Sequence, residues 1–222
     1  MPPSSADTRR KLIDAATRAF ADDGIFSASL IEITRQAGQK NRGALHYHFG
    51  SREGALCAVL EAHASFLARR EGELLAQAQQ RPADDVTSVV EAIVRPAVEL
   101  AESGWRGRCF LQVLAQLVEE DQTKLDPDVA AALAHTGGYE VYALLADRMG
   151  PMATDVRTER FSLVTSFILR AVADRARARE RRARGGREQL DLDGFVANLV
   201  AMVAAMLTAP TPDGIVDIST SP

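Results

Sequence analysis

Apolar residues recur at helical spacing along most of the chain, and strand-like alternation of apolar and polar residues is hard to find. Glycine and proline divide this pattern into segments that we expect to be helices. In the first part of the chain they cover about residues 8–23, 29–37, 42–49 and 51–67. In the second part they cover about residues 86–102, 105–120, 127–149, 154–184 and 191–207. The pattern predicts an all-α protein of about nine helices.

The first three expected helices have the layout of a helix-turn-helix. Ser29 and Glu32 form a Ser-x-x-Glu capping box at the start of the second helix, and Gly38 can take the positive φ of a tight turn before the third. Such a unit lays its second helix across the DNA backbone and its third in the major groove. The exposed residues expected around the third helix mix phosphate donors with groups that bond base edges: Gln39, Lys40, Asn41, Arg42, Gly43, His46 and Tyr47.

The chain has a net charge of -4, and its charged residues are distributed unevenly along the sequence. Residues 1–55 hold eight basic and six acidic side chains, for a net charge of +2, and the remainder holds 18 against 24, for -6. This distribution fits a protein that touches a polyanion at one end. The Arg-rich segment at residues 170–187 is interpreted as a solvated helix end and loop.

Three segments resemble the TetR family of transcriptional regulators. They are Arg10-Lys-Leu-Ile-Asp-Ala-Ala-Thr-Arg-Ala-Phe-Ala-Asp-Asp-Gly24, Ile31-Glu-Ile-Thr-Arg-Gln-Ala-Gly38 and Leu45-His-Tyr-His-Phe-Gly-Ser-Arg-Glu53. The resemblance covers roughly residues 8–65. It implies a helix-turn-helix DNA-binding domain over 8–55 and a larger helical domain for effector binding and dimerisation over 56–209. Residues 1–7 and 210–222 are expected to be flexible tails.

The resemblance also implies which residues contact DNA. The carried-over backbone contacts are Thr8, Ser29, Tyr47 and Arg52, and the expected base-facing residues are Arg42, Gly43, Ala44 and His46. Lys40 and Asn41 complete the expected DNA-binding set. The segment from Gly38 to Leu45 is one residue longer than the commonest family pattern, which leaves the base-reading register open. Either His46 or Tyr47 can donate to a phosphate, and Tyr47 is favoured.

His46 and His48 are the only pair in this region with metal-ligand chemistry, but they point about 200° apart on a helix and no further ligand completes a site. We therefore expect no metal and no other cofactor. His48 is interpreted as a packed residue that anchors the third helix to the first. No Gly-rich phosphate loop, nucleophile motif or Cys/His cluster points to an enzyme, so we expect no catalytic residues.

The second part of the chain contains Pro96 inside an otherwise helical run. Proline removes a backbone hydrogen bond and should kink the helix, which favours a cavity nearby. A mostly apolar pocket would suit a hydrophobic or aromatic small-molecule effector. The candidates to line it, each of which could equally be ordinary core, are Trp105, Cys109, Phe110, Val113, His135, Tyr139, Tyr142 and Phe161.

The last expected helix is apolar on nearly all sides, with no charged residue between Asp193 and Asp213. One stripe holds Val196, Val200, Val203 and Leu207. The other is assigned to a homodimer interface and holds Phe195, Leu199, Met202 and Met206. Such a helix must be buried on most sides. The alternative is a fully internal helix in a larger monomer.

The combined prediction is a homodimeric regulator of the TetR type that binds a pseudo-palindromic double-stranded DNA operator and is released as a repressor by its effector. The same DNA-binding and effector-binding domains would also serve a repressor that needs a co-repressor, or an activator. The absence of an export signal and of a run of about 18 apolar residues predicts a cytoplasmic protein without membrane contact. Cys57 and Cys109 are expected to be reduced, buried thiols, although a redox sensor acting through them is a rival interpretation.

Overall fold

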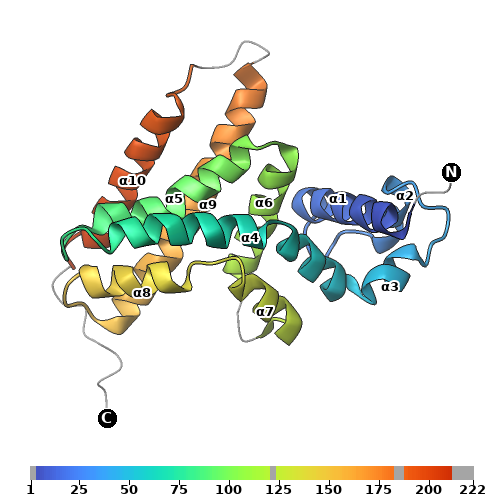
Figure 1. Cartoon of the computed structure of the whole chain (residues 1–222), viewed down its shortest axis with the longest axis horizontal. Helices are drawn as coiled ribbons and strands as arrows, with labels where there is room; N and C mark the ends of the chain where they lie inside the picture. The colour runs from blue at the N-terminus through green and yellow to red at the C-terminus, as the bar shows by residue number, and fades with distance from the viewer. Residues whose placement is uncertain (1–3, 121–123, 183–187, 212–222) are drawn as a thin grey trace. The chain divides into compact units, whose positions relative to one another are not determined.

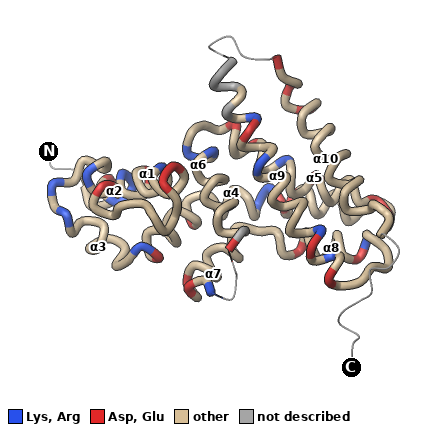
Figure 2. The backbone as a smooth tube through the Cα atoms, turned by 180° about the vertical axis from the view of Figure 1, so that it is seen from behind, with Lys and Arg blue, Asp and Glu red and all other residues tan. Residues whose placement is uncertain are grey.

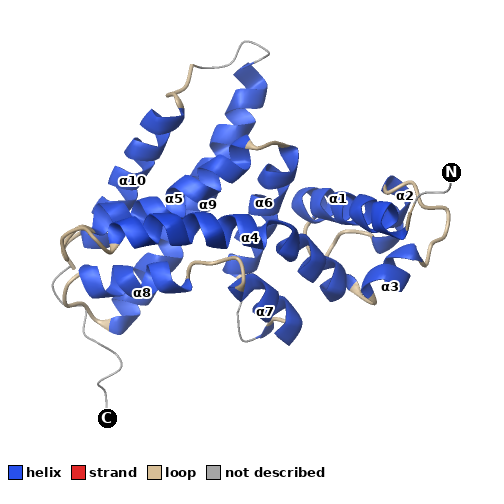
Figure 3. Cartoon of the chain, viewed as in Figure 1, coloured by secondary structure: helices blue, strands red, loops and turns tan. Residues whose placement is uncertain are grey.

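The computed structural model describes residues 4–120, 124–182 and 188–211. These residues form helices and connecting loops, with no strand among them (Figure 3). The helices, shown in Figure 1, are α1 (Ser5–Asp23), α2 (Leu30–Gln36), α3 (Ala44–Phe49), α4 (Arg52–Ala78), α5 (Val86–Glu102), α6 (Trp105–Glu119), α7 (Pro127–Ala134), α8 (Tyr139–Arg148), α9 (Thr154–Arg182) and α10 (Leu192–Thr208).

The described residues hold ten helices rather than the expected nine, because the helix expected over 127–149 is two helices. Gly137 and Gly138 both have positive φ, of 102° and 93°, and the chain leaves the helical path there. At the other end of the chain α1 begins earlier than predicted. Ser4 caps it by accepting the N–H of Asp7 at 3.1 Å, so the last residues of the expected 1–7 tail are helical. Residues 1–3 and 212–222 of the expected tails lie outside the described residues.

The chain forms two compact units, and each is described by itself. The first comprises Met1–Leu67 with Leu100–Gly137, and the second comprises Ala68–Glu99 with Gly138–Pro222. The expected functional division into residues 8–55 and 56–209 concerns DNA and effector binding, and it remains a prediction. None of the described helices is long and apolar enough to cross a lipid bilayer.

In the first unit, α6 packs along α1. Arg106 of α6 donates from Nε and Nη2 to the two carboxylate oxygens of Asp14 in α1, both at 2.6 Å. Gln116 lies in the last turn of α6, and its side-chain amide binds backbone groups of Phe20 and Ile25. The helix-turn-helix segment therefore has its own side-chain attachments to α6, besides its covalent continuation into α4.

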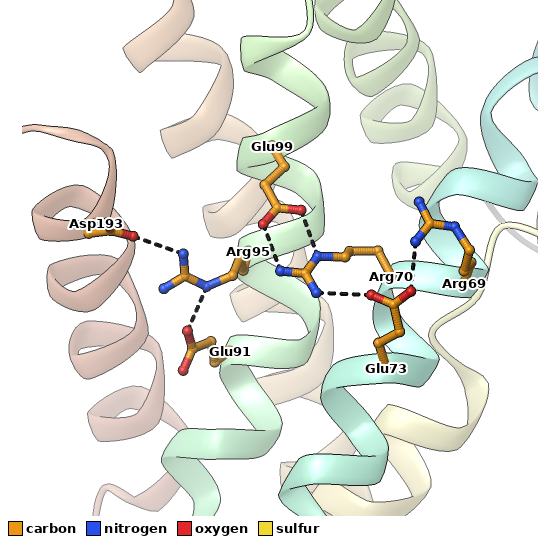
Figure 4. A network of polar contacts seen from close by, with 7 residues as sticks. All are labelled: Arg69, Arg70, Glu73, Glu91, Arg95, Glu99 and Asp193. Carbon is orange, nitrogen blue, oxygen red and sulfur yellow. Dashed lines mark hydrogen bonds and ion pairs between the residues drawn. The ribbon is translucent and has the colours of Figure 1, made fainter.

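In the second unit, ion pairs join helices that lie side by side in Figure 4. Arg70 of α4 makes a two-pronged pair with Glu99 of α5, at 2.8 and 3.0 Å. Arg95 of α5 binds Asp193 of α10 at 2.9 Å. α10 also packs on α9, where the face that contains Val196, Val200, Val203 and Leu207 is buried. That stripe, which was not assigned to the dimer interface, faces the core.

Candidate nucleic-acid interface

The turn between α2 and α3 is built by local capping interactions. The Ser29 hydroxyl accepts the N–H of Glu32 at 3.3 Å, which starts α2 at the predicted residue. Gly38 has a φ of 71°, a conformation that favours glycine, and it ends the segment as predicted. Asn41 then accepts the N–H of Gly43 at 2.9 Å and forms the turn that leads into α3. Serine, glycine and asparagine thus determine where the two helices begin and end.

The short helix α3 presents only part of its surface to solvent. Tyr47 is 82% exposed and His46 is also exposed, whereas Leu45 packs into the core of the unit. Ala44 was expected to face bases, but it is only 7% exposed. Its position in the first turn of α3 directs its methyl group into the unit beside Leu45. We therefore remove Ala44 from the candidate base contacts.

The loop before α3 carries exposed cations without nearby acids. Lys40 and Arg42 are both exposed, as is Gly43, and the sequence holds no acidic residue from Ile33 to Ser51. In Figure 2 the loop between α2 and α3 accordingly shows basic positions and no acidic ones. A surface of this kind attracts the phosphate backbone of a nucleic acid.

Arg52, an expected phosphate contact, has a clear internal role in this structure. Its Nη1 donates to the carbonyl oxygens of Ile25 at 2.7 Å and Ala28 at 2.8 Å. It thereby fastens the α1–α2 loop to the start of α4. Thr8 lies half-exposed in the first turn of α1, and Ser29 is exposed at the start of α2. Contact of these three residues with DNA stays a prediction.

His48 is half-buried, and its ring centroid lies 5.1 Å from that of Tyr47 and 6.1 Å from that of Phe49, its two neighbours in sequence. The role of His48 as an anchor of the third helix stays a prediction. In the part of the chain that the structure describes, no group of three or more His, Cys, Asp or Glu side chains is arranged to hold a metal ion.

The candidate pocket residues do not fall in one compact unit. The first unit contains Trp105, Cys109, Phe110, Val113 and His135, and the second contains Tyr139, Tyr142 and Phe161. Phe110 and Val113 are fully buried in the core of the first unit, where the Phe110 ring packs on His63 at 4.9 Å. Trp105 lies at the α1–α6 contact, with the guanidinium carbon of Arg18 at 4.3 Å from its ring centroid. Tyr139 is 80% exposed.

Tyr142 and Phe161 do lie together in the second unit, with ring centroids 5.1 Å apart. The Tyr142 hydroxyl bonds to that of Thr165, which in turn donates to the Phe161 carbonyl oxygen at 2.7 Å. Glu71 of α4 accepts the N–H of Gly138 at 2.7 Å, and burial raises the pKa of its carboxyl to about 7. These contacts give Tyr142, Thr165 and Glu71 hydrogen-bond partners within the unit, so they indicate packed structure as readily as a ligand site.

Of the four expected dimer residues, two lie on the outer face of α10. Met202 is 45% exposed, and Met206 follows it one turn later on the same face. Phe195 is half-buried, with the Arg175 guanidinium carbon 4.5 Å from its ring centroid. Leu199 is buried with the inner stripe, so its assignment to the outer face is wrong. Because apolar residues surround this helix, the sequence pattern does not show which of them face the core and which face outward.

Sequence reasoning missed the side chains that attach the helix-turn-helix to α6. Gln116 and Arg106 each bind residues more than ninety positions earlier in the chain. A local pattern holds no information about such contacts. The one available signal is that Gln116 interrupts an otherwise apolar run in α6, between Val113 and Leu117.

Two family descriptions match the chain. Residues 12–59 match the bacterial regulatory proteins of the tetR family. Residues 91–206, more than half of the chain, match the tetracyclin repressor-like C-terminal domain. The chain belongs to the TetR family. This match confirms the resemblance found in the three motifs. It also extends the similarity into the second half of the chain, which contains none of these motifs.

Two relatives of this TetR-family chain are HTH-type transcriptional regulators. The HTH-type transcriptional regulator AcrR of Shigella flexneri is 30% identical over 108 residues, which are 49% of this chain and 48% of AcrR. The regulator SrpR of Pseudomonas putida is 43% identical over 54 residues, 24% of this chain and 25% of SrpR. The chain thus matches about half of the length of AcrR and a quarter of SrpR.

Two solved structures share the TetR-family fold. AibR, crystallised with isovaleryl coenzyme A and operator DNA, aligns with a TM-score of 0.53 and 16% identity over 88% of this chain and 97% of AibR. The fatty acid degradation regulator FadR from Bacillus halodurans aligns with a TM-score of 0.52 and 17% identity over 91% of this chain and 95% of FadR. They confirm the predicted class, an all-α protein with a helix-turn-helix domain followed by a larger helical domain.

Proposed function

We propose that this TetR-family chain is a DNA-binding transcriptional regulator that places α3 in the major groove of double-stranded DNA. The observation that carries the proposal is the exposed surface of α3 and of the loop before it, a stretch of sequence from Ile33 to Ser51 without an acidic residue. Lys40 and Arg42 supply cations for the phosphates, and His46 and Tyr47 project from the helix itself. Tight local caps hold this surface in place, so it is formed before DNA arrives.

We propose that two copies of the chain form the dimer that binds the operator. The exposed methionines Met202 and Met206 give α10 an apolar outer face that a partner copy would cover. A two-fold dimer presents two α3 helices to successive major grooves about 34–36 Å apart, so the operator would be a pseudo-palindrome. We further propose that the protein is a cytoplasmic repressor without catalytic activity, as is general among TetR-family regulators.

Release by an effector is the proposed mode of control. AibR, which shares the fold, was crystallised with both operator DNA and a small molecule. An effector acts by binding the DNA-incompetent state more tightly than the competent one. We propose a hydrophobic or aromatic effector. The Arg106–Asp14 pair and the Gln116 amide would pass a shift of α6 to α1 and the α1–α2 loop.

The test begins with selection of a binding sequence from a random duplex library, followed by fluorescence anisotropy on selected and random DNA at several salt concentrations. Lys40→Ala should weaken binding to both DNAs and lower the salt slope by about 1. His46→Ala should reduce the ratio of specific to non-specific affinity by about tenfold. Arg81→Ala is the control, since Arg81 is an exposed cation of the second unit. Failure to enrich any sequence, or equal effects of His46→Ala on both DNAs, would contradict the proposal.

A further inference from the structure

Side chains of α4 bind two other segments near the places where the chain passes between its compact units. These places lie within α4, near the end of α5, and between α7 and α8. One turn after the first of them, Arg70 pairs with Glu99 of α5 at 2.8 and 3.0 Å (Figure 4). The next residue, Glu71, accepts the N–H of Gly138 at 2.7 Å, directly before α8. Both contacts lie within the second unit.

Only the first of these two contacts compensates the charge of its carboxylate. Glu99 is paired with Arg70, whereas Glu71 makes no ion pair with any residue that the structure describes. Glu71 is half-buried, and an ionised carboxyl in such a site loses hydration that the Gly138 N–H replaces only in part. Burial accordingly raises the pKa of the Glu71 carboxyl to about 7, although the Gly138 N–H lowers it.

The segment that Glu71 holds is built from two glycines. Gly137 and Gly138 have φ of 102° and 93°, and glycine gains more conformational freedom on release than any other residue. The Gly138 carbonyl oxygen accepts the N–H of Tyr142 at 2.9 Å and so starts α8, but glycine has no side chain to cap the helix. The Glu71 carboxyl is therefore the side-chain attachment of this segment.

We propose that the Glu71–Gly138 contact is a pH-sensitive switch, which keeps the α7–α8 segment on α4 while Glu71 is protonated and favours its release when Glu71 is ionised. The neutral carboxyl retains an oxygen that accepts the Gly138 N–H, so the contact is satisfied at low pH. The proton that Glu71 loses goes to solvent, and in the released state the carboxylate regains its hydration.

The size of the effect follows from the pKa of Glu71 in the two states. It is about 7 in the closed state and returns to the ordinary value of 4.5 on release. Such a group stabilises the closed state fully below pH 4.5, and this stabilisation is lost as pH rises through 7. The ratio of released to closed segment should therefore rise by about tenfold between pH 6 and 8 and little further above pH 8.

The groups around Glu71 do not supply a competing change of charge. From α8, Tyr142 interacts with Glu71, but burial raises the Tyr142 pKa above its ordinary value, so the phenol stays neutral in this range. Its hydroxyl bonds to that of Thr165, the uncharged neighbour from α9. From α5, the charge of Glu99 is compensated by Arg70.

Release would act on DNA binding through the connection between the units, and this consequence rests on the proposed function. The first unit contains the helix-turn-helix, and the second contains α10, the proposed dimer helix. A dimer binds both half-sites only while its two α3 helices keep the separation of the major grooves. A released α7–α8 segment leaves one fewer fixed connection, so the affinity for operator DNA should fall as pH rises.

The switch is tested by NMR on the full chain without DNA. The ¹³C signal of the Glu71 carboxyl, assigned through bonds, should titrate with a midpoint near pH 7 in wild type. Hydrogen exchange, corrected for its intrinsic rate, should show that protection of the Gly138 amide falls by about tenfold between pH 6 and 8. In Glu71→Gln, which stays neutral, this protection should change by less than about twofold.

Two control variants and a reference amide complete the measurement. Glu140→Gln and His135→Gln remove exposed groups on either side of the glycine pair and should keep the wild-type pH dependence. The amide of Val94, buried in α5, reports global unfolding of the second unit, and its protection should exceed that of Gly138 by about tenfold or more. A Glu71 midpoint near 4.5, wild-type pH dependence in Glu71→Gln, or equal protection of Gly138 and Val94 overturns the switch. Loss of the pH dependence in His135→Gln also overturns it, since the titrating group would then be His135.

The regulatory consequence is measured separately, as the affinity for the selected DNA at matched salt. Between pH 6 and 8 the affinity of wild type should fall by about threefold or more beyond the fall seen in Glu71→Gln. Equal falls overturn the regulatory consequence. A chain that binds no DNA at any pH overturns the proposed function, and the titration and exchange data then still decide the switch.

Discussion

The clearest test of how the helix-turn-helix is held concerns the Gln116 side chain. Its Nε2 donates to the carbonyl oxygen of Phe20, and its Oε1 accepts the N–H of Ile25, both at 3.0 Å. Phe20 and Ile25 are buried and lie where α1 ends and the α1–α2 loop begins. One amide therefore satisfies two backbone groups that secondary structure leaves unpaired at this point.

Gln116→Leu retains the approximate size of the side chain and removes both hydrogen bonds. A buried backbone group left without a partner costs about 1–3 kcal/mol. Two such groups would cost about 2–6 kcal/mol, and the lower end applies because Gln116 is only part-buried and water can approach. We expect a loss of about 2–3 kcal/mol in the free energy of unfolding of the first unit.

The assay combines urea unfolding with native-state hydrogen exchange at the Ile25 amide. Exchange at Ile25 should accelerate by about tenfold or more, since each 1.4 kcal/mol of local protection corresponds to a factor of ten. The matched control is Gln112→Leu, one turn earlier on α6, which should change the unfolding free energy by less than about 0.5 kcal/mol. Unchanged exchange at Ile25 in Gln116→Leu would refute the assigned role.

Two further predictions concern the second unit. Burial raises the pKa of Glu71 to about 7, so the stability linked to its neutral form is present below pH 4.5 and is lost as pH rises through 7. Glu71→Gln can still accept the Gly138 N–H, so it should flatten this pH dependence and raise the free energy of unfolding at pH 8 by up to about 3 kcal/mol. Urea titrations at pH 5 and 8 measure the change. The control is Glu140→Gln, and a change of stability with pH in Glu71→Gln like that of this control would contradict the prediction. Met202→Glu should dissociate the proposed dimer in sedimentation experiments, whereas Ala76→Glu, on an exposed site of α4, should not. A dimer that survives Met202→Glu unchanged would place the interface elsewhere.

Features of the fold that depend on neighbours in sequence could be predicted. The Ser29 cap and the Gly38 turn follow from the chemistry of a few adjacent residues, and the structure has both where the pattern placed them. The break at Gly137 and Gly138 had the same local signal, but glycine also occurs within helices. The pattern was therefore interpreted as one helix over 127–149, and the positive φ of both residues shows that the helix stops there.

Features that depend on helix phase or on distant contacts could not be predicted. Ala44 and Leu199 were assigned to exposed faces, and both are buried. For α3 the error comes from its length, because a six-residue helix has too few apolar positions to define its inward direction. For α10 it comes from the opposite cause, since apolar residues surround the helix. The attachment of Asp14 to Arg106 joins residues 92 positions apart, which no periodicity records.

Arg52 shows why the DNA contacts are harder to assign than the fold. A phosphate oxygen and a backbone carbonyl oxygen both accept from a guanidinium, so a cation at the start of a helix fits either partner. The structure shows two carbonyl partners, those of Ile25 and Ala28. Loss of DNA binding in an Arg52→Ala variant could then follow from a displaced α1–α2 loop as well as from a missing phosphate contact. Lys40, which is exposed in the loop before α3, separates these causes, because its removal deletes a cation without releasing the loop.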